Sequence, residues 1–212
     1  VYVVCEGQSE QAFVKRVMAE NLALKGLELH PFVARTSRGQ RGGITRYAKL
    51  RPQMVRLLAN RSFSCVTTMI DLYRLPTDFP GFSDASSIQD PIERAVQLEQ
   101  AMEQDIDNPR LIPNLTVHEF EGLLFSETSA FSILSSPNLA GRLSEIRRGV
   151  TSPEHIDEGE TTTPSKRIRA HYPKYEKLTH GIQVAERIGL DKIKDECTHF
   201  NDWIERLLAN CC

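Results

Sequence analysis

Four acidic residues stand where apolar, strand-like segments of this 212-residue sequence end. Glu6 follows VYVVC, Asp71 follows SCVTTMI, and Glu119 and Glu121 follow LIPNLTVH. Carboxylates that converge repel one another and raise each other's pKa, and a hard divalent cation relieves that repulsion. These residue types therefore predict a Mg²⁺ or Mn²⁺ site, provided that the fold brings the segment ends together.

Four predicted strands position these residues, at 1–5, 29–35, 64–70 and 111–117. Helices are expected between them, from Glu10 to about Lys25, from about Ile44 to Asn60, and over 90–106. This alternation predicts an α/β fold with a mainly parallel four-stranded sheet flanked by helices. All strand ends then lie at one edge of the sheet, where ligands of such sheets bind.

Capping residues and prolines refine these boundaries. Ser9 is the expected N-cap of the first helix, and Asp90 caps the helix at 90–106. Pro52 is expected to kink or split its helix, Pro31 indicates an edge strand, and Pro113 weakens the fourth strand. Beyond residue 126 the pattern is helical, broken by a polar loop at 151–166. We predict an α/β domain at 1–126 and a helical C-terminal extension at 127–212 packed on it.

Two basic stretches supply candidate phosphate contacts. The first surrounds three glycines at the end of the second strand and contains Arg35, Arg38, Arg41, Arg46, Lys49 and Arg51. The second contains Lys166 and Arg167, near the positive end of a helix that Thr163 would cap. From these stretches Arg38, Arg41, Lys166 and Arg167 are the predicted phosphate-binding residues. Taken alone, the second stretch is better explained as a solvated helix face.

Composition limits the function classes without choosing among them. The net charge is −2, so attraction to nucleic acid would have to come from a local patch. The five cysteines form no zinc-like spacing, and Cys5 and Cys65 are expected to pack as free thiols in a reduced, cytoplasmic setting. No segment has membrane-span length, and we expect no signal peptide. Because the chain opens inside a strand without Met, we expect a trimmed or incomplete N-terminus.

Less specific explanations remain open for the acidic residues. Any one of them is about equally well explained as a helix cap or a solvated loop residue. If the segment is extended, Glu119 and Glu121 point the same way. His118 is a candidate metal ligand or hydrogen-bond donor, and equally a packed histidine. No motif for a serine hydrolase, zinc protease or phosphate-binding loop is present.

The longest motifs resemble a known bacterial family. CEGQSE, TTMIDLYRLPTDFPG, IPNLTVHEFEGLLF, PEHIDEGETTTPSKRI and CTHFNDWIERL are similar to the family catalogued as domain of unknown function 4276. That family is Toprim-like, and CEGQSE resembles the opening motif of Toprim domains. The module occurs in topoisomerases, bacterial primases and the nucleases named for overcoming lysogenization defect.

The Toprim resemblance implies roles for particular residues. Glu6 matches the glutamate assigned to acid/base work or metal binding, and Asp71 matches the first of two metal-binding aspartates. Tyr73 stands where the second aspartate belongs, and a phenol is a poor Mg²⁺ ligand near neutral pH. Metal binding would therefore recruit Glu119 or Glu121, or would be weaker or absent.

The resemblance suggests three functions. The first is a Mg²⁺-dependent nuclease cleaving DNA or RNA, with Glu6, Asp71 and Glu119 as catalytic residues, acting in phage defence beside an ABC-type ATPase. The second is a non-catalytic interaction subunit of such a complex, which Tyr73 favours. The third is a small-molecule phosphatase or phosphotransfer enzyme at the same edge.

Overall fold

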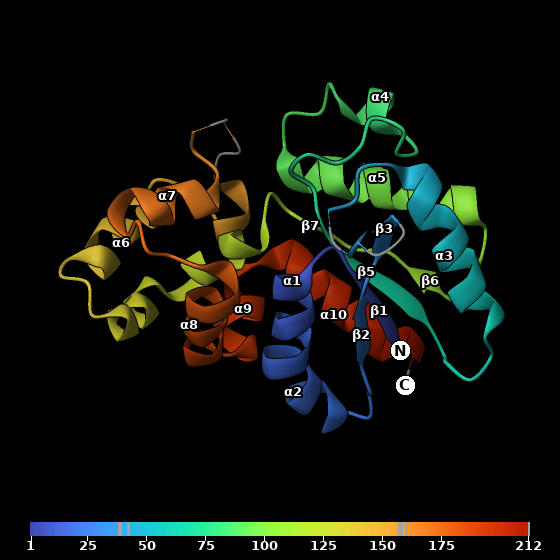
Figure 1. Cartoon of the computed structure of the whole chain (residues 1–212), viewed down its shortest axis with the longest axis horizontal. Coiled ribbons are helices and arrows are strands. Elements are labelled where there is room, and N and C mark those ends of the chain that lie inside the picture. The colour runs from blue at the N-terminus through green and yellow to red at the C-terminus, as the bar shows by residue number, and fades with distance from the viewer. Residues whose placement is uncertain (38–39, 42, 157–158, 160, 212) are drawn as a thin grey trace.

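The computed structural model describes residues 1–37, 40–41, 43–156, 159 and 161–211. Its central sheet has five strands, all parallel: β1 (Tyr2–Cys5), β2 (His30–Val33), β5 (Val66–Asp71), β6 (Leu111–Ile112) and β7 (Leu115–Thr116). β2 pairs with β1, β1 with β5, and β5 with both β6 and β7. The predicted mainly parallel sheet is confirmed (Figure 1). β2 lies at its edge, as Pro31 indicated.

The predicted fourth strand is two short strands instead of one. β6 ends at Ile112 and β7 begins at Leu115, so Pro113, which has no N–H, lies in the break. Thr68 of β5 satisfies the backbone there: its hydroxyl donates to the carbonyl of Asn114 at 2.7 Å and accepts the N–H of Asn114 at 2.8 Å. The break therefore leaves these buried backbone groups of Asn114 hydrogen-bonded.

The glycine-rich segment predicted as a loop contains a small antiparallel hairpin. β3 (Arg35–Ser37) pairs with β4 (Gln40–Arg41), and the predicted second strand ends earlier than expected, at Val33. Arg38 lies outside the described residues, and the side chain of Arg41 is not described.

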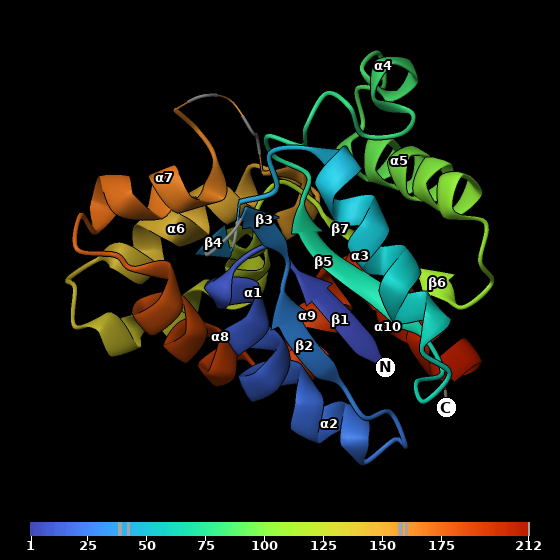
Figure 2. The same cartoon turned by 45° about the vertical axis from the view of Figure 1, so that its right-hand side comes forward.

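Helices cover both faces of the sheet. Val4, Val66 and Ile70 pack toward α3 (Tyr47–Ala59) and α5 (Pro91–Ile106). Val3 and Met69 pack toward the opposite face, against the first helical segment and α10 (Thr198–Cys211). Figure 2 shows α3 and α5 on one side of the strands and α1 and α10 on the other.

The first helical segment runs through α1 (Gln8–Phe13), a π-helical turn (Val14–Met18) and α2 (Ala19–Ala23). Its N-cap is Gly7, so the expected cap at Ser9 is wrong. Asp90 caps α5 as predicted, accepting the N–H groups of Ile92 and Glu93. Pro52 lies inside α3 without splitting it. The short helix α4 (Phe82–Ala85) lies in the long loop after β5.

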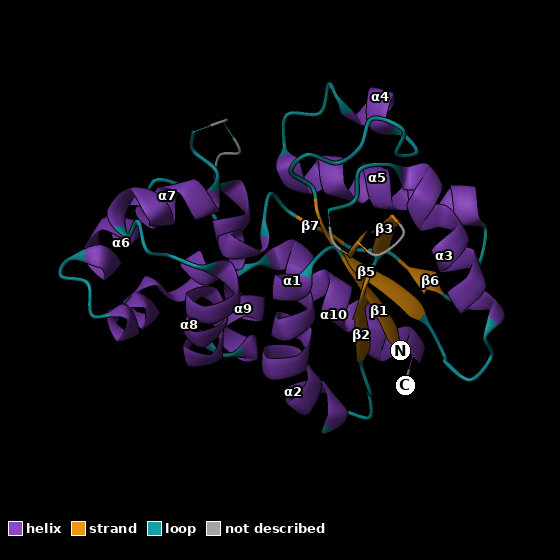
Figure 3. Cartoon of the chain, in the orientation of Figure 1, coloured by secondary structure: helices purple, strands orange, loops and turns teal. Residues whose placement is uncertain are grey.

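The chain after β7 is helical, as predicted (Figure 3). Its elements are a 3₁₀-helical segment η2 (Phe120–Leu134), α6 (Leu139–Arg148), η3 (Pro153–His155), α7 (Pro164–His171), the π-helical turn η4 (Lys177–Gly181), α8 (Ile182–Ile188), α9 (Leu190–Glu196) and α10. Buried side chains of these helices join the apolar core that Phe13 and Val3 form. The boundary at 126/127 stays a prediction. None of the described helices combines the length and apolar composition that a membrane crossing needs.

One prediction about the cysteines is wrong. Cys65, expected as a free packed thiol, forms a disulfide with Cys211. Cys65 directly precedes β5 and Cys211 ends α10, so the bond links the C-terminal helix to the start of the central strand. Cys5 and Cys197 are buried free thiols.

Candidate functional site

The first two acidic residues meet at the carboxyl ends of β1 and β5. Glu6 directly follows β1, and its Oε2 accepts the backbone N–H of Asp71 at 3.1 Å. Asp71 ends β5, and its Oδ1 accepts the N–H of Phe120 at 3.1 Å. Because β1 and β5 are parallel neighbours, their last residues lie side by side, as the sequence predicted. Both residues are half-buried.

A third carboxylate, Glu10, joins them from the first turn of α1. Glu10 is buried, and its carboxylate accepts the N–H of Gly7, the N-cap residue three positions earlier. This is the glutamate half of a capping box. A Cβ on Gly7 would stand 3.0 Å from Glu10 Oε2, so the glycine leaves room for the glutamate to fold back over the helix start.

Glu119 and Glu121 enter the site from the segment after β7. His118 adopts a left-handed backbone conformation (φ 62°), which turns the chain just before Glu119. Glu119 is extended and Glu121 lies in the 3₁₀ helix, so the expected extended geometry is wrong. Both side chains nevertheless point to one cation, because Lys177 Nζ lies 2.7 Å from Glu121 Oε2 and 3.8 Å from Glu119 Oε1.

Lys177 therefore provides the positive charge of this site. It belongs to η4 in the C-terminal extension, and its side chain is 30% exposed. Glu121 is fully buried, and its Oε1 makes no hydrogen bond with any described residue. We call Glu6, Glu10, Asp71, Glu119 and Glu121, together with Lys177, the carboxylate cluster.

Several acidic residues of the cluster have raised pKa values, because burial and the neighbouring carboxylates outweigh the positive charge of Lys177. Burial raises the pKa of Glu6 to about 7, the charge of Glu10 adds to the rise, and the N–H of Asp71 opposes it. Burial likewise raises the pKa of Glu121 to about 7 despite Lys177. For Asp71, burial and the charges of Glu10 and Glu6 raise the pKa well above its ordinary value.

The same balance governs Lys177. Burial alone lowers the pKa of Lys177, but Glu121, Asp71 and Glu119 outweigh that effect, and the net pKa is raised. The lysine is therefore protonated at every physiological pH. One described ammonium thus faces five acidic groups, and four of these, Glu6, Glu10, Asp71 and Glu121, have raised pKa values and hold protons more readily than exposed carboxyls do.

The acidic residues of the cluster are of the chemical type that binds a hard divalent ion, but their side chains are not arranged around a common point. All acidic ligands are oxygen donors, which Mg²⁺ prefers, and Glu121 Oε1 is buried without a partner among the described residues. Yet no group of three described His, Cys, Asp or Glu residues is placed to hold a metal ion. The sharing of one ion by Glu6, Asp71 and a third glutamate therefore stays a prediction.

The second basic stretch lies beside the cluster. Thr163 holds the N-cap position of α7, but its side chain makes no capping hydrogen bond. The N–H of Ser165 donates instead to Glu119 Oε2 at 3.1 Å. The protein's own carboxylate thus reaches the helix start where the sequence predicted an external anion. Arg167 donates from Nε to the carbonyl of Thr162, and the phosphate-binding roles of Lys166 and Arg167 stay predictions.

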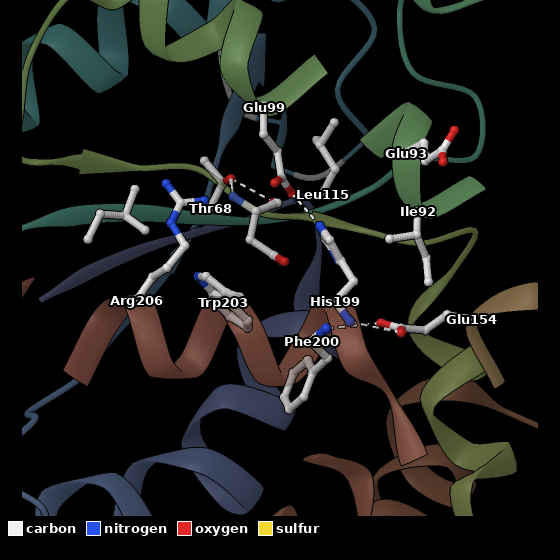
Figure 4. A network of polar contacts seen from close by, with 12 residues as sticks. Thr68, Ile92, Glu93, Glu99, Leu115, Glu154, His199, Phe200, Trp203 and Arg206 are labelled. Carbon is white, nitrogen blue, oxygen red and sulfur yellow. Dashed lines mark hydrogen bonds and ion pairs between the residues drawn. The ribbon is translucent and has the colours of Figure 1, made fainter. Parts of the chain in front are cut away.

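A second buried polar network holds α10 beneath the sheet (Figure 4). His199 Nε2 lies 3.0 Å from Glu99 Oε1, which also accepts the N–H of Leu115 in β7. Glu154 accepts the N–H groups of His199 and Phe200 at the start of α10, both at 3.0 Å. These contacts tie α5, β7 and η3 to the C-terminal helix, so the network has a structural role in positioning the segment that leads to Glu119.

Sequence reasoning missed Lys177 and Glu10. Lys177 stands in YPKYEKLTHG, where nothing distinguishes it from Lys174, because its burial depends on how the C-terminal extension packs. Glu10 carried a detectable signal: a glycine three residues before a glutamate at a helix start is a capping pattern, which the assignment of the cap to Ser9 concealed.

The fold and the site together define a parallel α/β protein with a charged, partly buried carboxylate cluster at the carboxyl edge of its sheet. A family model described as "Domain of unknown function (DUF4276)" matches residues 5–208, and the chain belongs to that family. Neither the curated proteins nor the solved structures contain a match.

Proposed function

We propose that this chain is a Mg²⁺- or Mn²⁺-dependent nuclease of the Toprim type that cleaves phosphodiester bonds of DNA or RNA. The observation that carries the proposal is the carboxylate cluster at the carboxyl ends of β1 and β5. Parallel α/β sheets bind their ligands at that edge. Five carboxylates share one lysine there, which favours binding of a divalent cation.

The residues divide into two roles. Asp71, Glu119, Glu121 and Glu6 would hold the ion, and a bound divalent ion supplies charge stabilisation at phosphate and a lower pKa for water. Glu6 is also suited to accept a proton, because its pKa of about 7 lies near the working pH of most enzymes. Lys177 is the residue whose ion pair with Glu121 would have to rearrange.

A non-catalytic interaction subunit is the alternative, and two observations favour it. Tyr73 replaces the second acidic residue of the Toprim pattern. Lys177 already pairs with Glu121 at 2.7 Å, so an ammonium stands among the expected metal ligands. Under this alternative the lysine replaces the ion permanently.

The resemblance to overcoming-lysogenization-defect nucleases extends the proposal to a cellular role. We propose a role in phage defence, beside an ABC-type ATPase partner. The disulfide between Cys65 and Cys211 argues against a strongly reducing compartment, since such bonds are rare in the cytosol. Cellular location is therefore tested separately from activity.

Hydrolysis assays test the central proposal. End-labelled DNA and RNA oligonucleotides are incubated with the protein in Mg²⁺, in Mn²⁺ or in EDTA. We expect metal-dependent cleavage that falls at least 100-fold in Asp71→Asn and is retained in Lys174→Met, a change at an exposed lysine. The protein could instead bind Mn²⁺ and hydrolyse a small phosphate ester while it cleaves neither DNA nor RNA. That result would favour the phosphatase function.

Nucleic acid binding has its own test in the first basic stretch. If Arg38 and Arg41 contact phosphates, the double variant Arg38→Ala/Arg41→Ala binds a labelled oligonucleotide more weakly and with a shallower salt dependence. Metal binding should be nearly unchanged. Equal salt slopes for wild type and variant would exclude these two residues from the interface.

A further inference from the structure

A second concave site opens beside the carboxylate cluster. It is a cavity of about 380 Å³ between the segment that follows β5, α4 and α5. Its lining consists of Leu72, Tyr73, Arg74, Leu75, Phe82, Ala85, Ser86, Arg94 and Leu98. This volume lies at the lower end of the range for small-molecule sites, so it suits a single compact ligand.

The lining combines apolar walls with positive charge. Leu72, Leu75 and Leu98 are buried and belong to the apolar core on the α5 face. Tyr73 and Phe82 add aromatic rings at partly exposed positions. The charged residues of the described lining are both arginines, and no carboxylate is among them. Such a site selects a ligand that has a flat apolar part and an anionic group.

Arg74 is held at the rim of the cavity. Its guanidinium lies 5.1 Å from the centre of the Tyr73 ring, and its backbone adopts a left-handed conformation (φ 61°) that is uncommon for arginine. The side chain is exposed and forms no ion pair with a described residue. Its charge is therefore available to an anion at the entrance.

The cavity begins one residue after the cluster. Asp71 ends β5, and Leu72 and Tyr73 continue alongside the next segment, donating to the carbonyls of Thr116 and His118. Two residues span at most about 7 Å, so Asp71 and Tyr73 border the same rim. Asp71 shares the face of Met69, whereas Leu72 packs toward α5. A ligand that crosses the end of β5 would reach both sites.

We infer that this cavity binds the base of a nucleotide next to the scissile phosphate, with Arg74 at the phosphate of that nucleotide. The inference rests on the proposed phosphodiester-cleaving function and specifies how its substrate is held. Nucleobases offer the flat apolar face that Tyr73 and Phe82 suit, and stacking on an aromatic side chain contributes about 1–3 kcal/mol per base. The adjoining phosphate supplies the anion.

Calorimetric titration in EDTA tests this inference without metal and without turnover. The probes are AMP and UMP, with ribose 5-phosphate and inorganic phosphate as the arms that lack a base. We expect saturable binding of at least one nucleotide and at least tenfold weaker binding of both base-free probes. Equal affinity for inorganic phosphate and AMP would show a simple anion site and overturn the assignment of a base pocket.

Variants locate the binding. Arg74→Ala and Phe82→Ala should each weaken nucleotide binding about tenfold, the loss expected for one stacking or phosphate contact. Ser86→Trp fills the cavity from an exposed position, so it should abolish binding without disturbing the core. Arg56→Ala, at an exposed arginine of α3 outside the cavity, is the matched control and should bind as wild type does.

The outcomes separate this inference from the proposed function. Absence of nucleotide binding by wild type, or full binding by Ser86→Trp, would overturn the base pocket and leave metal-dependent cleavage untouched. Nucleotide binding that survives in Asp71→Asn, together with loss of cleavage in the same variant, is the result that supports both.

Discussion

The most consequential residue of the site is Lys177, a described cation that forms ion pairs with Glu119 and Glu121. It neutralises part of the charge of Glu121, which is fully buried, and it lowers the cost of ionising Asp71. Removing one partner of a buried ion pair leaves the other charge uncompensated, which costs more than the pair itself contributes. Lys177 therefore links the C-terminal extension to the sheet edge by charge as well as by packing.

This leads to a prediction for Lys177→Met. At pH 8 the variant should lose about 3 kcal/mol in free energy of unfolding, the low end of the cost of breaking a buried ion pair, because the Lys177 side chain is 30% exposed. At pH 5 the loss should be smaller, because Glu6 and Glu121, with pKa values of about 7, are protonated. Urea unfolding at the two pH values measures both.

Two further variants control this prediction. Lys174→Met changes an exposed lysine nearby and should leave stability within about 0.5 kcal/mol. Glu121→Gln should recover most of the loss when combined with Lys177→Met, because the uncompensated charge is removed. A loss of equal size at both pH values would mean that Lys177 acts by packing alone.

At the scale of single residues, the acidic residues that follow strands could be recognised in the sequence. The charged residues that a helix start and a distant turn contribute were missed. Glu6 and Asp71 could be predicted because two parallel neighbouring strands must end together. Lys177 could not, since its approach depends on the packing of a distant turn, and Glu10 was missed because the cap was assigned to Ser9 instead of Gly7. The ion-sharing geometry predicted for these acids took no account of Lys177, whose ion pair with Glu121 was not foreseen.

At the scale of elements, strand predictions depended on apolar runs and were reliable for β1, β2 and β5. The segment 111–117 was harder, because Pro113 interrupts the ladder and Thr68 repairs it through side-chain hydrogen bonds. Such a repair requires a partner strand that no local pattern reveals. The hairpin of β3 and β4 was missed because both strands are very short and stand among glycines, which are depleted in strands.

The disulfide between β5 and α10 provides a prediction at this scale. It closes a loop with a sequence separation of 146 residues, and a cross-link of that size stabilises a fold by about 5 kcal/mol in the chain-entropy account. Cys211→Ser should therefore lower the free energy of unfolding by that amount under oxidising conditions. Cys212→Ser is the matched control and should retain both the bond and the stability.

Thiol counting and urea unfolding, each with and without reductant, measure this. After denaturation without reductant, wild type should show fewer reactive thiols than Cys211→Ser does, because the substitution leaves Cys65 as a free thiol. Wild-type stability that does not respond to reductant would contradict a stabilising role for the bond.

At the scale of the whole molecule, the titrating groups predict an unusual dependence of stability on pH. Glu6 and Glu121 have folded-state pKa values of about 7, above the ordinary value of 4.5. Their contribution is fully present below about pH 4.5 and is lost as pH rises through 7. For His199, burial lowers the pKa but Glu99 outweighs it, so its contribution is likewise lost on raising the pH.

Other carboxyls act in the opposite direction at lower pH. The N–H of Glu93 lowers the pKa of Asp90, and Lys192 lowers that of Glu196, so their contributions are lost as pH falls through the lowered pKa values. Thermal unfolding in EDTA should therefore show maximal stability near pH 5 to 6 and a decline toward pH 8. Stability that rises steadily from pH 5 to 8 would contradict the assignment of elevated pKa values to the cluster.

A divalent cation should remove much of that decline, because a ligand that binds the folded state alone stabilises it. The most direct measurement is titration of Mn²⁺ into wild type, Asp71→Asn and Lys174→Met at pH 8, followed by calorimetry. We expect saturable binding of one Mn²⁺ per chain by wild type and Lys174→Met, and at least tenfold weaker binding by Asp71→Asn. No saturable binding by wild type at pH 8, or equal binding by Asp71→Asn, would contradict a metal-dependent site and favour the non-catalytic alternative.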